Sequence, residues 1–344
     1  MAKRAHNTVG LDIEPGGITA VQVAVDGRTV ERAAFAPLEA GIVREGEIVD
    51  VEALTAALRA LWKGNRGLRK RVRVGVASQK IVVRAMELPV INNPAELDTA
   101  VRFQAADQIP MPIESAVLDH VPLEVADDGA GPRQRVLLVA ARRDMIERVL
   151  AAVRGAGLRA EGIDLAAFAM VRALHRDHHD DHVLYLAVGG LTNLAVTRGA
   201  TCVFTRASAG GLDALAVELA ERCALTLEHA RAWLAHVGLE RPSELIEGDP
   251  EITRDARRVL LDGVRRIAAD VRTSLDFHDA QGAADARVAR AVLTGAAASI
   301  PGFAAALSAE LGMRVDVGEV EGPAGLEPGR LAIAAGLAVT EVPR

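Results

Sequence analysis

Alternating apolar and polar positions predict two β-hairpins, one near the start of the chain and one near its middle. In residues 8–23, the alternation continues on both sides of a glycine-containing turn at 14–17. A second pair of strands, residues 183–188 and 194–197, flanks the turn 189–193. A period of two that is interrupted by such a turn is typical of a hairpin. Because glycine is ordinary turn chemistry, these patterns alone predict structure rather than function.

Residues 71–164, between the two hairpins, read as a unit of their own. The first part, 71–89, is rich in strand-forming residues, and a helix follows with Asn93 as its N-cap and Pro94 at its first position. This helix is expected to reach residue 108, and it is followed by strands at 116–125 and 134–141 and a helix at 141–158. The order of strands, helix, strands and helix predicts a small α+β module inserted into the first domain.

The second half of the chain alternates helices with strands. Its longest pattern, residues 249–278, predicts a helix with one apolar stripe and with arginines off that stripe, on a face that we expect to be solvated. The stripe consists of Leu260, Val264, Ile267, Val271 and Leu275, and the arginines are Arg257, Arg258, Arg265 and Arg266. The other expected elements are a helical stretch at 213–236, strands at 291–295 and 315–317, and helices at 304–312 and 331–340.

With 344 residues, the chain is long enough for about two domains. Half of the residues are apolar and a quarter are charged, which is an ordinary balance for a globular protein. The pattern places the first domain in residues 1–70 and 165–181, an inserted subdomain in 71–164 and the second domain in 182–344. The mixture of helices and strands predicts the α/β class.

Composition excludes several classes of function. Aromatic residues make up 3% of the chain and the net charge is −6, so nothing favours nucleic acid as a partner. Cys202 and Cys223 are too few for a disulfide framework or a thiolate metal site, and they fit a reducing compartment. Asp12 precedes any apolar stretch of signal-peptide length, and no window is apolar enough for a membrane span. We therefore expect a cytoplasmic protein that reaches a membrane only through a partner.

Two polar segments each allow two interpretations. The run HRDHHDDH, residues 175–182, holds His175 and His179 at the i, i+4 spacing of a zinc site, but it lacks thiolates and reads better as a solvated connector. We expect no metal there. The basic residues from Lys63 to Arg73 form either a surface for anionic phospholipid or a solvated loop ahead of a strand, and the sequence does not decide between them.

Five stretches, in order along essentially the whole chain, carry a family resemblance. They are VGLDIEPGGITAVQV, RFQAADQIPMPIESAVLDHVPLE, LAVGGLTNLAV, VRTSLDFHDAQ and LTGAAASIPGF. Together they resemble the type IV pilus assembly protein PilM family and, more distantly, the cell-division protein FtsA. The resemblance implies an actin-like ATPase (ribonuclease H-like) fold of two domains with an inserted α+β subdomain. In that fold, two phosphate-binding hairpins face each other across a cleft.

The resemblance also implies ATP with Mg²⁺ as the cofactor of this cleft. Backbone N–H groups of glycine-rich turns would cradle the phosphates, and a carboxylate at a strand end would hold Mg²⁺ through water. The residues that match the family's nucleotide contacts are Asp12, which would be that carboxylate, Gly16, Gly17, Gly189, Gly190, Thr192, Asn193 and Gly295.

Four departures from the family pattern lower the expected affinity for nucleotide. Glu14 stands where the family usually has glycine, and Thr19 stands where it commonly has lysine. Ala187 stands where the second hairpin usually has aspartate, and Ala296-Ala297 replaces a glycine pair at the adenine-contacting turn. Each change removes a favourable contact or adds repulsion, and a charge-assisted contact is worth about 1.5–3 kcal/mol. We expect weak or undetectable ATP binding, no hydrolysis and no catalytic residue.

The function that the resemblance implies is a cytoplasmic scaffold of the type IV pilus inner-membrane assembly platform. Its expected partner is a PilN-like inner-membrane protein, whose cytoplasmic N-terminal peptide binds between the inserted subdomain and the first domain, with other platform proteins nearby. An extended peptide gains main-chain hydrogen bonds at a strand edge while its side chains fill pockets. The expected wall of this groove consists of Ile81, Val83, Met86, Leu88 and Pro89.

Two other functions stay open, because this architecture hosts both kinases and filaments. An active actin-like ATPase or a sugar-kinase-like phosphotransferase would need the carboxylate that Ala187 replaces. A membrane-bound filament of the FtsA type would need a basic amphipathic C-terminal helix, where the sequence reads GLAVTEVPR. The sequence leaves open whether the chain forms homo-oligomers.

Overall fold

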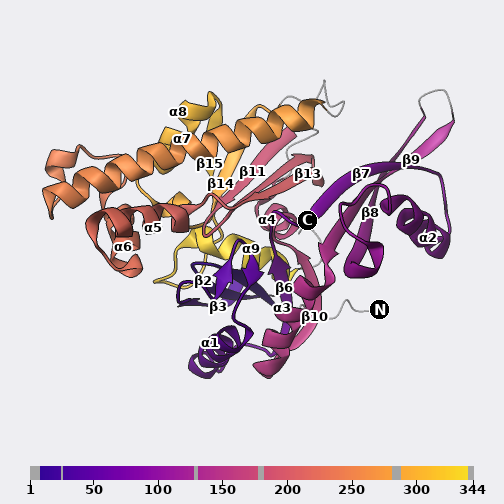
Figure 1. Cartoon of the computed structure of the whole chain (residues 1–344), viewed down its shortest axis with the longest axis horizontal. Coiled ribbons are helices and arrows are strands. Elements are labelled where there is room, and N and C mark those ends of the chain that lie inside the picture. Colours follow the sequence, from indigo (N-terminus) through magenta and orange to yellow (C-terminus); the bar gives the residue numbers. More distant parts are fainter. Residues whose placement is uncertain (1–7, 25, 128–130, 177–181, 281–287, 340–344) are drawn as a thin grey trace.

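Two five-stranded sheets form the body of the protein, and a three-stranded sheet stands beside them (Figure 1). The computed structural model describes residues 8–24, 26–127, 131–176, 182–280 and 288–339. The strands are β1 (Val9–Glu14), β2 (Gly17–Val23), β3 (Val30–Pro37), β4 (Val43–Arg44), β5 (Glu47–Ile48), β6 (Arg71–Val76), β7 (Val82–Pro89), β8 (Ala116–Asp127), β9 (Pro132–Arg142), β10 (Arg159–Leu165), β11 (His182–Val188), β12 (Thr192–Arg198), β13 (Thr201–Ser208), β14 (Arg290–Thr294) and β15 (Arg314–Val317). The helices are α1 (Val51–Gly64), α2 (Pro94–Ala105), α3 (Arg143–Gly155), α4 (Ala166–Leu174), α5 (Leu212–Cys223), α6 (Leu227–Val237), α7 (Pro250–Ala280), α8 (Phe303–Leu311) and α9 (Pro328–Ala338), with short 3₁₀ turns η1 (Ile113–Ser115), η2 (Ser243–Leu245) and η3 (Ala296–Ser299).

The first sheet has the strand order β10-β6-β1-β2-β3 and contains the first predicted hairpin. In that hairpin, Glu14 pairs with Gly17 across a two-residue turn. Strand β6 runs parallel to β1, and β10 runs parallel to β6. Leu11 and Ile18 face a core that α1 and α3 close on one side of the sheet. Helices α4 and α9 cover the other side, where Val21 is buried.

The inserted unit is smaller than the sequence pattern predicts. Strands β6 and β10, at the two ends of the expected unit, pair within the first sheet, and α3 packs into the core of that sheet. The predicted boundaries at Arg71 and Asp164 are therefore wrong. Alternation predicts that a segment is a strand but not which sheet it joins, and parallel neighbours lie far apart in sequence. The inserted part is the three-stranded sheet with α2, residues 82–142.

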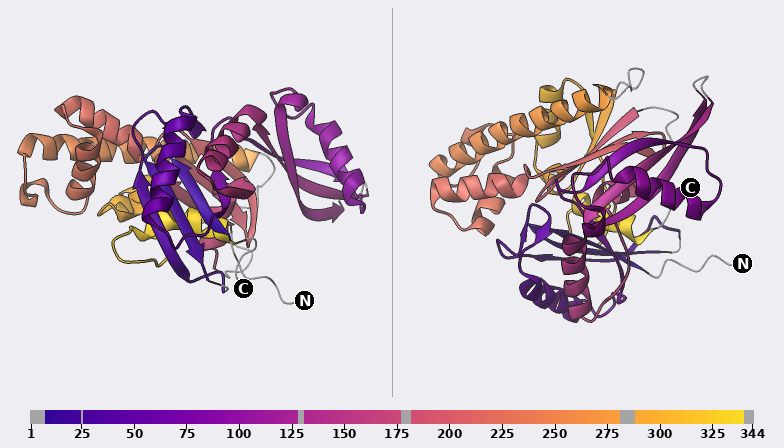
Figure 2. Two further views of the ribbon diagram at one scale, coloured as in Figure 1. Left: turned by 90° about the horizontal axis from the view of Figure 1, so that it is seen from below. Right: turned by 45° about the vertical axis from the view of Figure 1, so that its right-hand side comes forward.

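The three-stranded sheet, with the order β7-β9-β8, carries α2 on one face and has a small core of its own. Helix α2 begins at Pro94 as predicted, because the Asn93 side chain accepts the Ala95 N–H at 3.0 Å, but it ends at Ala105 rather than at residue 108. In both views of Figure 2 this unit lies on the opposite side of the body from α5 and α6.

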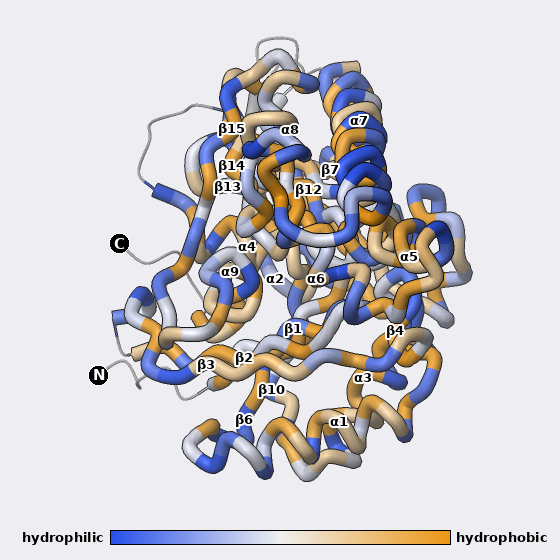
Figure 3. Tube along the Cα trace, turned by 90° about the vertical axis from the view of Figure 1, so that its left-hand side faces the viewer, coloured by the Kyte–Doolittle hydropathy of each residue, from blue (hydrophilic) through white to orange (hydrophobic). Residues whose placement is uncertain are grey.

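The second sheet has the order β13-β12-β11-β14-β15 and contains the second predicted hairpin, β11–β12. Helix α7 buries four residues of the predicted apolar stripe and partly buries Leu275. Figure 3 shows apolar and hydrophilic positions in alternation along this helix. The stretch predicted as helical at 213–236 forms two helices, α5 and α6. Ala224 adopts a left-handed conformation, with φ of 51°, and this ends α5.

Two arginines from the predicted basic faces bind backbone carbonyls instead of facing solvent fully. Arg73 donates to the carbonyls of Leu337 and Val339 at 2.9 and 2.8 Å, which ties β6 to the end of α9. Arg257 donates to the carbonyl of Leu239 at 3.2 Å. The other three arginines named on α7 are exposed, as predicted.

Helix α9 joins the two large sheets. A third core cluster contains residues of β2, β11 and β12 together with most of α4 and α9. The helix packs so closely against its neighbours on two sides that only glycine fits at one contact position on each side. A Cβ at Gly10 of β1 would overlap the carbonyl of Ala334, and a Cβ at Gly336 would overlap the carbonyl of Ala169 in α4. The two halves of the chain therefore share one core around this helix.

Within the described ranges, every helix is too short or too polar to cross a membrane. The same residues contain no group of three or more His, Cys, Asp or Glu side chains that could hold a metal ion. Residues 177–181 of the histidine-rich run, His179 included, lie outside the described part of the chain, as do the final residues 340–344.

Candidate functional site

The turns of the two predicted hairpins meet. The first turn follows Glu14 at the end of β1, and the second, residues 189–191, follows β11. The Glu14 carboxylate reaches across, and its Oε2 accepts a hydrogen bond from the Gly190 N–H at 2.9 Å. The two halves of the chain are thus joined directly where the family resemblance implies nucleotide phosphates.

Glycine is required in these turns because the backbones approach too closely for side chains. A Cβ at Gly189 would overlap the Glu14 carboxylate, and a Cβ at Gly190 would lie 2.7 Å from the proline ring of the first turn. A Cβ at Gly16 would lie 3.2 Å from Asp213 Oδ2, at the start of α5. The lack of side chains at these glycines therefore allows the two hairpins to come into contact.

The cleft between the hairpins is acidic, and Asp12 within it is buried. Burial raises the pKa of Asp12 well above its ordinary value, and the neighbouring Glu14 carboxylate raises it further. Burial also raises the pKa of Glu14, while the bond from the backbone N–H and the nearby Arg330 guanidinium lower it. Arg330 is held at the edge of the cleft by an ion pair with Glu327 and by stacking over the Phe35 ring, 4.9 Å from its centroid.

A small cavity lies beside the first turn, between the first hairpin and the start of α9. Asp12, Glu14, Gly17, Gly295 and Arg330 line a cavity of about 20 Å³. That volume holds about one water molecule, whereas pockets for larger ligands measure roughly 300–1,000 Å³. This cavity is therefore too small for a nucleotide.

Two of the predicted nucleotide contacts face opposite ways. Thr192 and Asn193 are consecutive in β12, so their side chains lie on opposite faces of the sheet. The Thr192 hydroxyl donates to the Gly210 carbonyl. Asn193 lines a different pocket, between β12 and β7. The structure therefore does not bring these two side chains to one ligand.

The other positions singled out in the cleft are closely packed. Gly295 has a φ of 82°, which favours glycine, and its N–H donates to the Gly329 carbonyl at 3.1 Å. Ala297 and Ala187 are fully buried. Thr19 pairs across the hairpin with Asp12 and lines the small cavity. These positions supply neither a cation nor a second carboxylate to the cleft.

Two cleft residues, Arg330 and Asp213, lie outside the sequence prediction. Asp213 pairs with Arg231 at 2.8 Å, and its Oδ2 lies against the first turn. Arg330 is an isolated charge in an otherwise apolar helix. The sequence did contain a signal for both residues. Gly-Gly precedes α5 and Pro-Gly starts α9, and each pair marks the beginning of a helix, where a charged side chain can face a cleft.

A groove of about 580 Å³ lies between the inserted sheet and the second sheet. Strand β7 forms one wall and β13 forms the other, and each is an edge strand of its own sheet. The apolar part of its lining consists of Ile81, Val82, Val83, Ala85, Leu137, Val203, Phe204, Ala207 and Phe277. We call this the β7–β13 groove.

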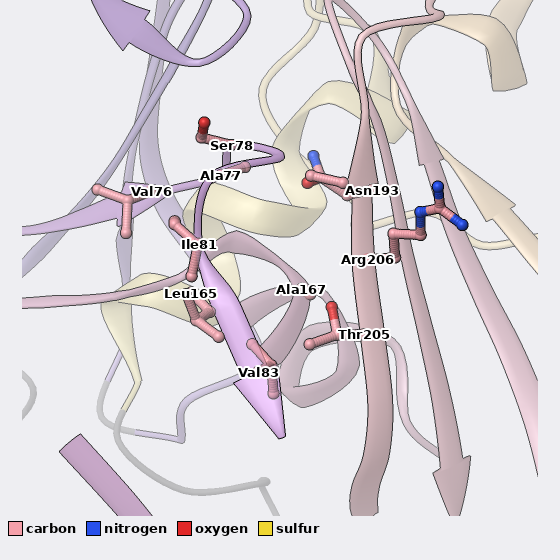
Figure 4. Close-up of a pocket in the computed structure, with 11 residues that line it drawn as sticks. Val76, Ala77, Ser78, Ile81, Val83, Leu165, Ala167, Asn193, Thr205 and Arg206 are labelled. Carbon is pink, nitrogen blue, oxygen red and sulfur yellow. The ribbon is translucent and has the colours of Figure 1, made fainter. Parts of the chain in front are cut away.

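A smaller pocket adjoins the groove at the point where all three sheets come together (Figure 4). Ala77 and Ile81 lie on one side, near β7, and Thr205 lies on the other, on β13. Leu165 and Ala167, from the end of β10 and the start of α4, close it from the first sheet. A ligand in the groove would therefore reach residues of both large sheets as well as the inserted one.

Two of the five residues predicted for the groove wall line the β7–β13 groove, namely Ile81 and Val83. Met86 and Leu88 are instead buried in the core beneath α2, so their predicted place in the wall is wrong. They lie on the α2 side because alternate residues of a strand face opposite sides of the sheet. Pro89 is exposed at the end of β7, beyond the lining of the groove. The opposite wall comes from the second sheet, whereas the sequence prediction named the first domain.

Comparison with known proteins gives the following matches. A family model described as type IV pilus assembly protein PilM matches residues 10–322. A solved PilM–PilN type IV pilus biogenesis complex is similar with a TM-score of 0.79 and 24% identity, over 96% of this chain and 97% of that chain. The ethanolamine utilization protein EutJ from Carboxydothermus hydrogenoformans is similar with a TM-score of 0.59 and 17% identity, over 96% and 88%. MreB5 of Spiroplasma citri bound to ADP has a TM-score of 0.57 and 11% identity, over 96% and 94%. These likenesses confirm the predicted actin-like ATPase fold.

Proposed function

The chain belongs to the PilM family of type IV pilus assembly proteins, and on this premise we propose that it is a scaffold of a type IV pilus assembly platform. It acts at the inner face of the cytoplasmic membrane, where it holds the cytoplasmic N-terminal peptide of a PilN-like membrane protein. The choice of partner is supported by the solved relative, which is a complex of PilM with PilN. It neither binds ATP tightly nor hydrolyses it.

The observation that carries this proposal is the β7–β13 groove, which we propose as the site of the peptide. The groove follows the chain from Ile81 to Ala85, and nine of its fourteen lining residues are apolar. In the described part of the chain, β7 pairs only with β9 and β13 pairs only with β12, so each keeps one edge for a further strand. An extended peptide could add to such an edge while its side chains enter the apolar pockets.

The geometry of the hairpins supports the proposed lack of nucleotide function. The Gly190 N–H is already bonded to Glu14, and the cavity beside the first turn measures about 20 Å³. Ala187 offers no carboxylate for a metal ion. The scaffold role is therefore proposed to depend on a bound peptide rather than on an ATP cycle.

The test is a titration of a synthetic peptide, the N-terminal cytoplasmic segment of the PilN-like partner, against the full chain. Val83→Arg places a long cation in the β7–β13 groove and should weaken binding at least about tenfold. Val125→Arg, at an exposed position of β8 outside the groove lining, is the matched control and should bind like the wild type. A deletion of residues 71–164 is unsuitable, because it removes β6 and β10 from the first sheet.

Equal affinity of Val83→Arg and Val125→Arg, with both variants folded by circular dichroism, would show that the groove is the wrong site. No binding by the wild type would contradict the choice of partner itself.

A further inference from the structure

Glu14 makes an unusual contact for a carboxylate at the end of a strand. It accepts the N–H of Gly190, in the turn of the opposite hairpin, at 2.9 Å, and that turn has no side chain on the side facing Glu14. A glycine turn with an N–H pointing into a cleft is an anion-binding arrangement, because the backbone donates and no Cβ blocks the approach. Here the anion that it binds belongs to the chain itself.

Burial raises the pKa of Glu14, but two neighbouring groups, the Gly190 N–H and the Arg330 guanidinium, favour its anionic form. Arg330 lies close enough to stabilise the negative charge, and it is oriented by Glu327 and Phe35. The other carboxylates near the turn, Asp12 and Asp213, carry no bond to Gly190 and would repel a second anion. The cleft is thus arranged to hold one carboxylate and to reject further negative charge.

We propose that Glu14 is an internal ligand of the second hairpin, in which its carboxylate takes the place of a phosphate on the Gly190 N–H. This inference rests on the proposed lack of nucleotide function and adds a cause for it. The side chain does two things at once: it occupies the anion site, and it joins the first domain to the second without any bound molecule. The cleft is closed permanently by a covalently attached group.

This proposal predicts that shortening Glu14 creates an anion site. Glu14→Ala frees the Gly190 N–H and removes the carboxylate whose negative charge Arg330 stabilises. Binding of pyrophosphate and of ATP, each with and without Mg²⁺, should become about 10- to 100-fold tighter than in the wild type, as expected when the ligand receives one additional charge-assisted hydrogen bond. Calorimetry on the full-length protein measures this increase in affinity.

Two further variants isolate the cause. Glu14→Gln keeps an oxygen that can accept the Gly190 N–H and fills the same space, so its affinity for pyrophosphate should rise little. Glu39→Ala removes an exposed glutamate of the same domain and should behave like the wild type. In a separate measurement, hydrogen exchange in residues 186–191 should be faster in Glu14→Ala than in Glu14→Gln, because only the alanine variant loses the acceptor of the Gly190 N–H.

Unchanged pyrophosphate binding and unchanged hydrogen exchange in Glu14→Ala would overturn the internal ligand, even if the wild type binds no nucleotide. An equal increase in affinity in Glu14→Gln would also overturn it, because charge repulsion alone would then explain the exclusion. Micromolar ATP binding by the wild type is a different result, and it would contradict the proposed lack of nucleotide function.

Discussion

Phe204 of β13 and Phe277 of α7 lie with their ring centroids 6.2 Å apart and their planes tilted by 47°, in the wall of the β7–β13 groove. Aromatic residues make up only 3% of the chain, so two of them in one groove are more than an even distribution along the chain would place there. Phe277 is 49% exposed. Half-exposed aromatic side chains in a concave surface are typical anchors for a bound partner.

Phe277→Ala should weaken binding of the partner peptide by about tenfold or more, since an aromatic anchor of an interface commonly contributes about 2 kcal/mol. Phe103→Ala is the matched control, because Phe103 lies on α2 outside the groove lining and is 84% exposed. Fluorescence anisotropy of a labelled peptide measures both affinities. A loss of similar size in Phe103→Ala would move the binding surface to α2.

The purified protein should release phosphate from ATP no faster than a blank without protein. The physical reason is that the Glu14 carboxylate occupies the Gly190 N–H and that β11 carries Ala187 at the position of the second carboxylate. A coupled phosphate assay with Mg²⁺ measures the rate. Steady release that Asp12→Asn abolishes would restore the ATPase or phosphotransferase alternative.

Asp12→Asn should stabilise the protein, and more at pH 8 than at pH 4. The pKa of Asp12 is raised in the folded state by burial, so the folded state binds more protons than the unfolded state once the pH exceeds the ordinary value near 3.9. The free energy of unfolding therefore falls as the pH rises toward the raised value, and asparagine lacks this loss. A gain of about 1 kcal/mol would raise Tm by roughly 2–4 °C.

The control for this pH dependence is Asp26→Asn. The Asp26 carboxylate accepts the backbone N–H groups of Arg28 and Thr29 and the Thr29 hydroxyl, and these bonds lower its pKa to about 2. Its contribution is present above the ordinary pKa and is lost as the pH falls toward about 2, so its removal should lower Tm slightly at pH 8. A fall in Tm in both variants would mean that the Asp12 charge is stabilised by partners and not penalised by burial.

Arg73→Met should lower the free energy of unfolding by about 1.5 kcal/mol, the lower end of the range for hydrogen bonds to charged groups, because Arg73 is only half buried. The lost bonds are those to the carbonyls of Leu337 and Val339. Arg66→Met, at an exposed position in the same basic stretch, should change stability by less than about 0.5 kcal/mol. Urea unfolding followed by circular dichroism compares the two. Equal stability of both variants would show that the link from β6 to α9 contributes nothing.

Local sequence patterns predicted the parts of the fold that depend on neighbours in the chain. Both hairpins, the start of α2 at Asn93 and the long helix α7 follow from periodicity and capping within a few residues. The partner of a parallel strand has no such local signal. For that reason β6 and β10 were predicted as strands correctly but assigned to the wrong unit.

The candidate site also has one part that the local sequence predicts and another that it does not. Glycine turns and the unexpected Glu14 can be read from the sequence, but the bond between Glu14 and Gly190 joins residues 176 positions apart and needs the whole fold. The same holds for the groove. Val83 could be predicted as a wall residue from β7 alone, whereas Phe277 comes from a helix almost two hundred residues later. The sequence prediction placed Met86 in the wall, but Met86 is buried beneath α2, because pattern alone does not decide which face of a short strand is the buried one.

Helix α9 has a consequence for the synthesis of this protein. It covers β1 and β2, although its own residues are translated after every strand of both large sheets. While the ribosome is still making the second domain, α4 can cover part of this face, but the area over β1 and β2 that α9 covers stays open to water. Domains generally fold as units as they emerge, but this one must wait for a helix that follows the whole second sheet. A premature stop codon before Pro328 would leave the strands of the first sheet in the product but remove a helix that covers them. The truncated product would therefore be prone to aggregation.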